Sequence, residues 1–407
     1  MNGRNKVIPY PQERALEDAM FGRGLVPTRI FPLLLPVWEV EVKATVTDGR
    51  PYQLIDRYLE RGIAEGGLGT RAELAGFFAL DVSLVDRAVR VLGAIGHLTE
   101  HDGRLALTEL GRRSQRDQVC YLIEREDRRK LYFDGFLSRP LTRPYYQASV
   151  VTLMSQPEAR AATVANAYPR FGMLWTATGF RREALTELAN QKDRDRYNLP
   201  TRIENPESVG EQLVHLPLYV VRATDRQRRV HHLAYSQVGD TADPELSELC
   251  ELSPEINGVL NSEEIAAKPN VQETHVHNWL KGKNLGGFRP EPLADGDWRI
   301  TLPANAFDPG GPVPPSKLGS YVVLSSCLLR VDCDDEETRK RTLLTRVENY
   351  LAGRSRVTAA DVEARIDRVA RQLRLSADMR SVREMASGDG RSGFARRLSG
   401  LLDGTLE

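Results

Sequence analysis

Two pairs of histidines are the first residues whose types and spacing could serve chemistry. His275 and His277 occur in the segment ETHVHNW, and His231 and His232 are adjacent in RVHHLAY. Histidines two residues apart share one face of an extended segment and can chelate zinc, but a zinc site needs further ligands. No histidine, cysteine or carboxylate stands at a recognisable spacing from them, so we expect no metal and no cofactor.

Catalytic motifs are missing from the sequence. It contains no GxxxxGK[ST], no GxGxxG after a strand, no GxSxG and no HExxH, and the segment GDGRSG from Gly388 follows a polar helix rather than a strand. We therefore expect a protein that is not an enzyme. A degenerate nuclease with dispersed acidic residues is the alternative left open.

Cations gather in two places. One is the segment 128–146, where cations interleave with aromatic residues, and the other is the turn near 222–229. Arginine beside aromatic rings can bind single-stranded nucleic acid by stacking and charge. The alternatives are a connector whose aromatics fill a core, and a solvated turn between edge strands. The cations are Arg128, Arg129, Lys130, Arg139 and Arg143 in the first segment, and Arg222, Arg226, Arg228 and Arg229 in the second.

The overall composition gives no electrostatic argument for a nucleic-acid partner, because 56 Lys and Arg balance 56 Asp and Glu. Four cysteines are scattered without CxxC spacing, which is typical of reduced thiols in the cytoplasm. The amino terminus has no signal-peptide core, and the most apolar run, IFPLLLPVW, is interrupted by Pro32 and Pro36. We expect a cytoplasmic protein without a membrane span.

Hydrophobic periodicity places a strand and several helices before residue 118. The segment 37–46 alternates as a half-buried strand does, and helices are expected over 54–63, 70–78 and 82–95. HLTE and RLAL flank a turn at 101–104, and Thr108 caps the helix that follows. The expected core face of the helix 82–95 is Leu84, Val85, Ala88, Val89, Leu92 and Ile95.

This order of three helices, a hairpin and a further helix is that of a winged helix-turn-helix. Residues 50–117 resemble the winged-helix domains of MarR-like and ArsR-like bacterial regulators, in which a hairpin leading into LTELGRRS is a common ending. The resemblance implies that the helix 82–95 enters the major groove of DNA. The DNA-binding residues would be Ser83, Arg87 and Arg90 on this helix, Arg104 at the hairpin, and Arg128, Arg129 and Lys130 beyond it.

The same fold also serves in protein contacts, as in helicases and condensin-like complexes, and in dimers of methyltransferases. Residues 51–118 carry nine arginines, no lysine and ten acidic residues, a net charge of minus one. DNA binding normally needs several cationic phosphate contacts. The wing could therefore touch DNA or a protein.

The chain as a whole is expected to be an α+β multidomain protein. The expected parts are an irregular N-terminal arm and a strand (1–49), the winged helix (50–118), a mainly helical connector (119–200), a mixed α/β domain (201–333) and a helical C-terminal region (334–407). The function expected is that of a DNA-binding bacterial transcriptional regulator whose C-terminal part senses a ligand or mediates assembly. The alternative is a non-catalytic adaptor of a DNA-processing or defence complex. Its partners would be double-stranded DNA, a second copy or another protein.

Overall fold

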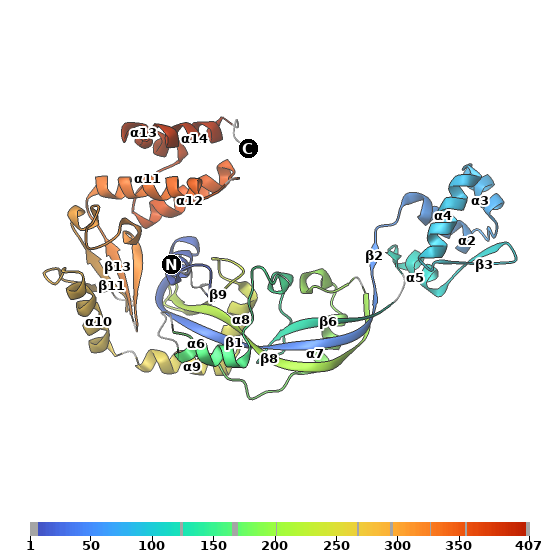
Figure 1. The fold of residues 1–407 in the computed structure, drawn as a ribbon, viewed down its shortest axis with the longest axis horizontal. Helices are drawn as coiled ribbons and strands as arrows, with labels where there is room; N and C mark the ends of the chain where they lie inside the picture. The colour runs from blue at the N-terminus through green and yellow to red at the C-terminus, as the bar shows by residue number, and fades with distance from the viewer. Residues whose placement is uncertain are drawn as a thin grey trace. The chain divides into compact units, whose positions relative to one another are not determined.

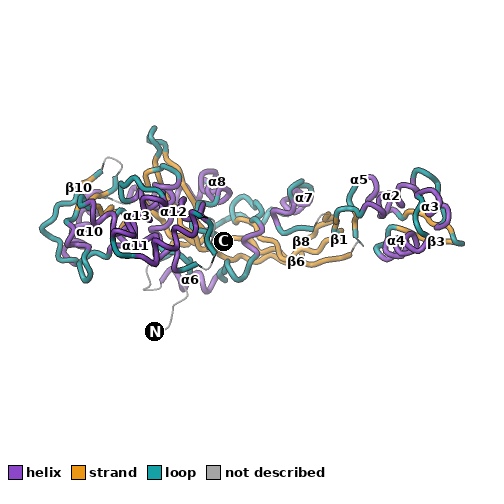
Figure 2. The backbone as a smooth tube through the Cα atoms, turned by 90° about the horizontal axis from the view of Figure 1, so that it is seen from above, coloured by secondary structure: helices purple, strands orange, loops and turns teal. Residues whose placement is uncertain are grey.

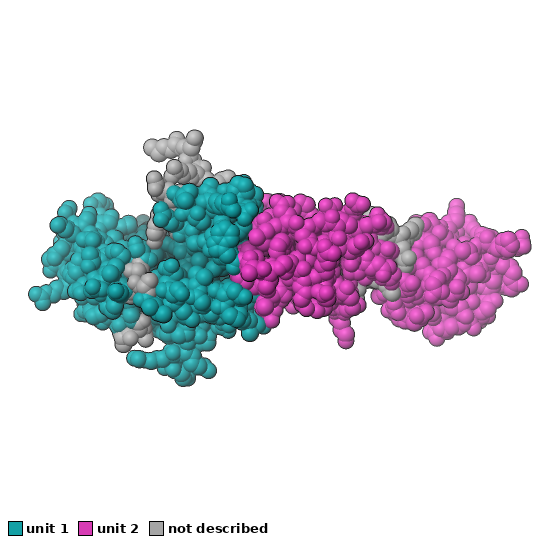
Figure 3. All heavy atoms as spheres, turned by 90° about the horizontal axis from the view of Figure 1, so that it is seen from below, with its two compact units in different colours: residues 1–35, 152–175, 215–407 teal, residues 36–151, 176–214 magenta. Residues whose placement is uncertain are grey.

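The chain folds into two compact units of mixed α and β structure. The computed structural model describes residues 7–122, 125–164, 170–200, 202–266, 268–293, 296–325, 327–354 and 356–403. Unit 1 consists of residues 1–35, 152–175 and 215–407, and unit 2 of residues 36–151 and 176–214 (Figure 3). The long strands β1 (Val26–Thr47) and β8 (Arg202–Thr224) contribute residues to both.

Within unit 2, residues 49–122 form a group of helices with one hairpin, which we call the helical domain (Figure 1). Its two ends are paired, because β2 (Gly49–Arg50) lies antiparallel to β5 (Cys120–Tyr121). The expected hairpin is confirmed, with Leu98 opposite Leu107 and His101 opposite Arg104. The elements in order are α2 (Leu54–Ala64), α3 (Arg71–Phe78), α4 (Val82–Ala94), β3 (Leu98–His101), β4 (Arg104–Leu107) and α5 (Glu109–Asp117).

Local signals in the sequence explain where these elements begin and end. The Thr70 hydroxyl accepts the Glu73 amide at 3.2 Å, and the Glu73 carboxylate accepts the Thr70 amide at 3.0 Å, so the two residues form a capping box at the start of α3. Gly96 takes a left-handed φ of 81° after α4. Thr108 accepts the amide of Gly111 at 3.1 Å, as expected for the cap of α5.

The core of the helical domain corrects part of the sequence interpretation. Val85, Val89 and Leu92 are buried as expected, but Leu84 is 38% exposed. Leu84 precedes Val85 by 100° around the helix, which places it outside the inward arc. On α2, Leu54 and Tyr58 are 69% and 47% exposed for the same geometric reason.

The rest of unit 2 contains a sheet where helices were expected. Residues 125–134 form β6 (Arg125–Asp134), antiparallel to β1 with Val37 opposite Asp134. The prediction of a mainly helical segment from 119 to 200 was therefore wrong. Figure 2 shows β1, β6 and β8 side by side. One face packs on α7 (Glu183–Ala189), and the core there includes Val40, Val42, Ala44, Val46, Leu131, Phe133, Leu185 and Leu188.

Unit 1 begins with ordered helix rather than the expected irregular arm. Residues from Gln12 to Glu17 form α1, and a π-helical turn, η1 (Asp18–Gly22), continues it. Ala15, Leu16 and Ala19 are fully buried. The expectation of an irregular arm was therefore wrong for residues 12–22, because so short a helix shows no clear hydrophobic period. Residues 1–6 lie outside the described residues.

The hairpin expected around TDRQR is present in unit 1. Strand β8 pairs with β9 (Val230–Ser236) from Leu218 opposite Ser236 to Thr224 opposite Val230. The short β7 (Gly172–Met173) lies parallel to β1. The helices of this part are α6 (Gln156–Val164), α8 (Pro244–Leu252) and α9 (Pro254–Ala266).

A second sheet and the C-terminal helices share one core. The strand order is β10-β11-β13-β12, and the buried cluster runs from Val276 to Leu401. The strands β10 to β13, expected in a domain 201–333, therefore pack with the helices of the region 334–407, which was expected to be separate. The elements are α10 (Pro269–Gly282), β10 (Glu291–Pro292), β11 (Trp298–Thr301), η5 (Pro315–Lys317), β12 (Ser320–Leu324), β13 (Cys327–Asp332), α11 (Glu336–Ala352), α12 (Ala359–Gln372), α13 (Met379–Gly388) and α14 (Ser392–Leu402).

None of the helices in the described part of the chain has both the length and the apolar character that crossing a membrane requires.

Candidate functional site

The solvent-facing side of α4 carries three of the residues expected to contact DNA. Ser83, Arg87 and Arg90 are all exposed, and Arg90 is 72% exposed. Arg90 lies 3.3 Å from the Asp86 carboxylate one turn earlier. Within the described ranges, Arg87 makes no ion pair or hydrogen bond. One free cation and one paired cation therefore mark this face.

Arg104, the fourth expected residue, is turned back onto the domain. A Cβ atom on Gly69 would lie 3.1 Å from Nη2 of Arg104, so the guanidinium rests over Gly69. The backbone supports this position, because Leu105 donates its amide to the Gly69 carbonyl at 2.7 Å. The absence of a side chain at Gly69 is what allows the contact. Arg104 does not extend from the hairpin tip.

Arg71, a further cation near α4, is neutralised by the carboxylates of Asp86 and Glu100. Arg71 donates from Nε to Asp86 at 2.9 Å and makes a two-pronged contact with Glu100 at 2.6 and 2.7 Å. The hydrogen bond from Arg71 lowers the pKa of the Glu100 carboxyl, and the bond to Glu100 raises the pKa of Arg71. The charge of Arg71 is thus already balanced within the domain.

Apolar side chains stand exposed on α2 and α3 of the same domain. Leu54, Tyr58 and Phe77 are 69%, 47% and 68% exposed. The Tyr58 and Phe78 ring centroids are 6.4 Å apart, and those of Phe78 and Phe77 are 4.9 Å apart. Leu54 precedes Tyr58 by one helical turn. We call these four residues the α2–α3 patch.

A glycine on α2 explains the geometry of this patch. A Cβ atom on Gly62 would lie 2.9 Å from the Phe78 ring, so only glycine lets that ring rest on α2. Phe78 packs against the core of the domain, and Phe77, one residue earlier on α3, points outward. On α4, Val82, Leu84 and Val91 are also at least 38% exposed. Monomeric proteins rarely leave large contiguous apolar patches in water.

Sequence reasoning missed a buried polar network in the helical domain. Glu60, His97 and Ser114 are fully buried. His97 Nδ1 lies 2.5 Å from Glu60 Oε1, and the Tyr52 hydroxyl donates to Glu60 Oε2 at 2.6 Å. His97 Nε2 contacts both the Tyr121 carbonyl and, at 3.2 Å, the Ser114 hydroxyl.

This network resembles a Glu-His-Ser triad in composition but not in chemistry. A carbonyl oxygen only accepts, so the bond to the Tyr121 carbonyl requires a proton on His97 Nε2. That nitrogen therefore cannot take a proton from Ser114. Ser114 in turn accepts the Tyr121 amide at 3.2 Å. The network ties α2 and α5 to β5, where the domain joins the rest of unit 2.

Strand β6 carries the first three cations of the segment 128–146, and two of these are paired. Lys130 Nζ lies 2.5 Å from Glu39 Oε1, and Arg129 pairs with Asp127 and donates to the Asn198 carbonyl at 2.9 Å. Arg128 is exposed opposite Lys43. The aromatics turn inward: Phe133 and Tyr145 are buried, and the ring centroids of Tyr132 and Tyr146 are 4.8 Å apart with the rings tilted by 37°. A stacking platform for bases is not formed, which agrees with the connector interpretation.

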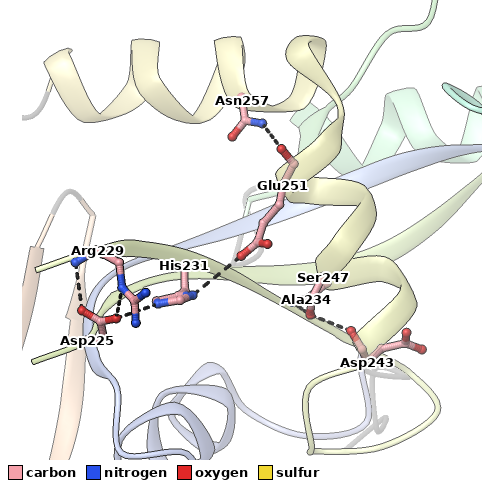
Figure 4. Close-up of polar contacts among 8 residues, drawn as sticks. All are labelled: Asp225, Arg229, His231, Ala234, Asp243, Ser247, Glu251 and Asn257. Atoms are coloured by element: carbon pink, nitrogen blue, oxygen red, sulfur yellow. Dashed lines mark hydrogen bonds and ion pairs between the residues drawn. The ribbon is translucent and has the colours of Figure 1, made fainter. Parts of the chain in front are cut away.

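The β8–β9 hairpin in unit 1 is organised by a single carboxylate (Figure 4). Asp225 accepts the backbone amides of Gln227 and Arg229 at 2.8 and 2.9 Å and the Arg229 Nε at 2.7 Å. Desolvation opposes ionisation here, but the hydrogen bonds from Arg229 and His231 prevail and lower the pKa of the Asp225 carboxyl. Arg229 thus holds the turn together.

His231 links this turn to α8. Its Nε2 is 3.3 Å from Asp225 and its Nδ1 is 3.8 Å from Glu251 (Figure 4). An open groove of about 520 Å³ is lined in part by His231, Glu251, Arg222 and Asn257. The charges in this groove are balanced, since Arg222 also lies 3.8 Å from Glu264. The other histidine pair, His275 and His277, lies on helix α10. No group of three metal-ligating side chains occurs among the residues that the structure describes.

Comparison with known proteins gives no relative: no family model, no characterised protein and no solved structure matches this chain.

Proposed function

We propose that the helical domain is a winged-helix module that docks onto a protein partner, and that the chain acts as a non-catalytic adaptor in a larger complex. The observation that carries this proposal is the α2–α3 patch, in which Leu54, Tyr58 and Phe77 stand exposed around a seated Phe78. Aromatic and aliphatic side chains gathered in this way are typical of the centre of a protein interface.

The order of elements supports the winged-helix part of the proposal. Three helices precede the β3–β4 hairpin, and α5 follows it directly. Helices α3 and α4 are joined by the short turn 79–81, in which Ala79 takes a left-handed φ of 53°. This is the connection expected between the two helices of a helix-turn-helix.

The rim of the patch indicates the chemistry of the partner. Arg57 lies on α2 between Leu54 and Tyr58, is exposed, and makes no ion pair within the described residues. Arg61 follows Tyr58 by three residues and pairs with Glu65 at 2.7 Å. The partner that fits is an apolar segment with an acidic side chain at its edge, opposite Arg57.

Duplex DNA is the second candidate, because Ser83, Arg87 and Arg90 share the exposed side of α4. Two observations count against it. Asp86 directly precedes Arg87 and pairs with Arg90 one helical turn later. Arg71 is already paired with Asp86 and Glu100. The cations left for phosphate contacts are fewer than those of ordinary DNA-binding domains.

A photo-crosslinking amino acid at position 77 in the full-length protein tests the docking proposal in cells. The matched control is the same amino acid at Thr99, which is exposed on the hairpin. We expect one protein to be captured from position 77 and not from position 99, and Tyr58→Asp to abolish the capture. Capture of a second copy of this chain would replace the adaptor with a self-assembling protein. Equal capture from positions 77 and 99, or no capture from either, would contradict the docking proposal.

A further inference from the structure

A second candidate site lies wholly within unit 1, where α1 meets η5, α11 and α12. A cavity of about 250 Å³ opens there. Its walls come from segments far apart in the sequence, and most of its side chains are charged or polar. The lining residues used below are Glu13, Arg14, Glu17, Lys317, Arg346, Arg365 and Gln372.

Arg346 forms the fixed floor of this cavity. Its Nη2 donates to the carbonyls of Ser316 and Leu318 at 2.8 and 2.6 Å, and its Nη1 donates to Gln372 Oε1 at 2.9 Å. Gly319 makes this arrangement possible: a Cβ atom there would lie 2.5 Å from the Gln372 carbonyl, and its φ is +68°. No carboxylate accepts from Arg346 among the described residues.

Two donors in the cavity lack acceptors. Gln372 is 1% exposed, and its Nε2 has no hydrogen-bond partner in the described structure. The buried Nε of Arg365 also has none, and the guanidinium of Arg365 lies 5.8 Å from the centroid of the Tyr350 ring. A buried donor left without an acceptor is unfavourable, and more so when it is charged.

The two carboxylates of the cavity do not fill this need. Glu13 pairs with Lys317, and Glu17 accepts the Ser320 hydroxyl at 2.8 Å. Arg14 is 3.9 Å from Asp240, at the limit of an ion pair. Four cations and two carboxylates line the cavity, which leaves a net charge of plus two. Burial and the charge of Arg14 lower the pKa of the Arg365 guanidinium to about 10.

We propose that this cavity binds the dianion of a phosphomonoester. Guanidinium groups hold phosphate oxygens with paired N–H donors, and the amide of Gln372 supplies a further donor. A dianion balances the net charge of the lining. The volume of about 250 Å³ is more than one phosphate group fills, so part of the molecule that carries the phosphate also fits inside. This inference goes beyond the proposed function and does not depend on it, because it concerns residues of unit 1 alone.

Phosphate binding is tested on the full-length protein by thermal unfolding and titration calorimetry. Inorganic phosphate at about 10 mM should raise the Tm by about 3 °C or more over chloride at equal ionic strength. Arg365→Met should weaken phosphate binding about tenfold or more. Arg371→Met is the matched control, since Arg371 lies on the same helix, is 53% exposed and pairs with Asp367. It should bind phosphate as the parent protein does.

A second variant guards against a folding defect. Gln372→Glu places a carboxylate beside Arg346 and Arg365, so it should raise the Tm without phosphate and abolish the phosphate response. Adenosine monophosphate and a 5′-phosphorylated oligonucleotide, compared with their unphosphorylated forms, distinguish a free metabolite from a nucleic-acid end as the source. The proposal is overturned if phosphate acts no differently from chloride, or if Arg365→Met and Arg371→Met bind phosphate equally well.

Discussion

The helical domain leaves apolar side chains exposed, whereas the cavity of unit 1 leaves hydrogen-bond donors without acceptors. In the helical domain the acidic and basic side chains are mostly paired with one another, as Arg71 is with Glu100, while Phe77 and Leu54 stand in water. Around the cavity the apolar residues form a closed core, while Arg365 and Gln372 keep donors without acceptors. The helical domain lacks apolar contacts, and the cavity lacks hydrogen-bond acceptors.

The comparison shows that different partners suit the two regions. Exposed apolar area costs about 25 cal/mol per Å² relative to burial, and a protein surface is what removes that cost. Unpaired buried donors are satisfied instead by a small anion. The same chain can therefore hold a protein-docking surface and an anion site that respond to different substitutions.

The largest expected effect concerns the network that closes the helical domain. His97 bonds Glu60, the Tyr121 carbonyl and Ser114, and each buried polar group that loses a hydrogen bond costs about 1–3 kcal/mol, so losing this side chain costs about 3 kcal/mol or more in all. His97→Leu should therefore lower the free energy of unfolding by about that amount in urea denaturation. The double variant Glu60→Leu, His97→Leu should recover part of the loss. If His97→Leu is as stable as the parent protein, the contact between His97 and Glu60 does not contribute to stability.

The core and the surface of α4 should respond differently. Leu92 is fully buried, so Leu92→Ala should cost about 2–5 kcal/mol. Leu84, at 38% exposed, is the matched control, and Leu84→Ala should cost less than about 1 kcal/mol. Equal losses in urea denaturation would mean that Leu84 belongs to the core, as its sequence pattern suggested.

Loss of the α3 cap should have a smaller effect. Thr70→Ala removes the hydroxyl that accepts the Glu73 amide and should cost about 1 kcal/mol. Thr99→Ala, on an exposed strand position, should be nearly neutral. The contrast between these two threonines in thermal unfolding checks whether the capping box contributes to stability.

The smallest effect is a dependence on pH in unit 1. Burial lowers the pKa of the His215 imidazole below its usual 6.5, so the unfolded chain binds a proton first as the pH falls. The stability that neutral His215 contributes is thus present above pH 6.5 and declines below it. His215→Leu should flatten this decline in unfolding curves between about pH 7.5 and 5. An unchanged slope would assign the acid sensitivity to other groups.

Much of the local structure could be predicted from sequence, because its signals lie within a few residues. The caps at Thr70 and Thr108, the turn after Gly96 and both hairpins are of this kind. Strand β6 was missed because the polar residues Asp127 and Arg129 stand on the same face as the buried Leu131 and Phe133, which obscures the alternation.

The candidate sites depended on contacts that no local pattern contains. The contact between the Tyr58 and Phe78 rings depends on the packing of Phe78 against Gly62. The cavity joins Arg14 to Arg365 and Gln372 across most of the chain. Of the residues expected to bind DNA, Ser83, Arg87 and Arg90 share an exposed helix face, whereas Arg129 and Lys130 are paired within the sheet.

The central claim is that the helical domain presents a protein-docking surface rather than a DNA-binding one. Its most direct test is a salt titration of duplex binding by the full-length protein and by the variant Arg87→Glu, Arg90→Glu, beginning at about 50 mM salt. We predict binding no tighter than about 100 µM, equal for both proteins, since the charge count of the domain supports only weak contact. A dissociation constant below about 1 µM that weakens steeply with salt and is lost in the variant would contradict the account and return the function to DNA binding.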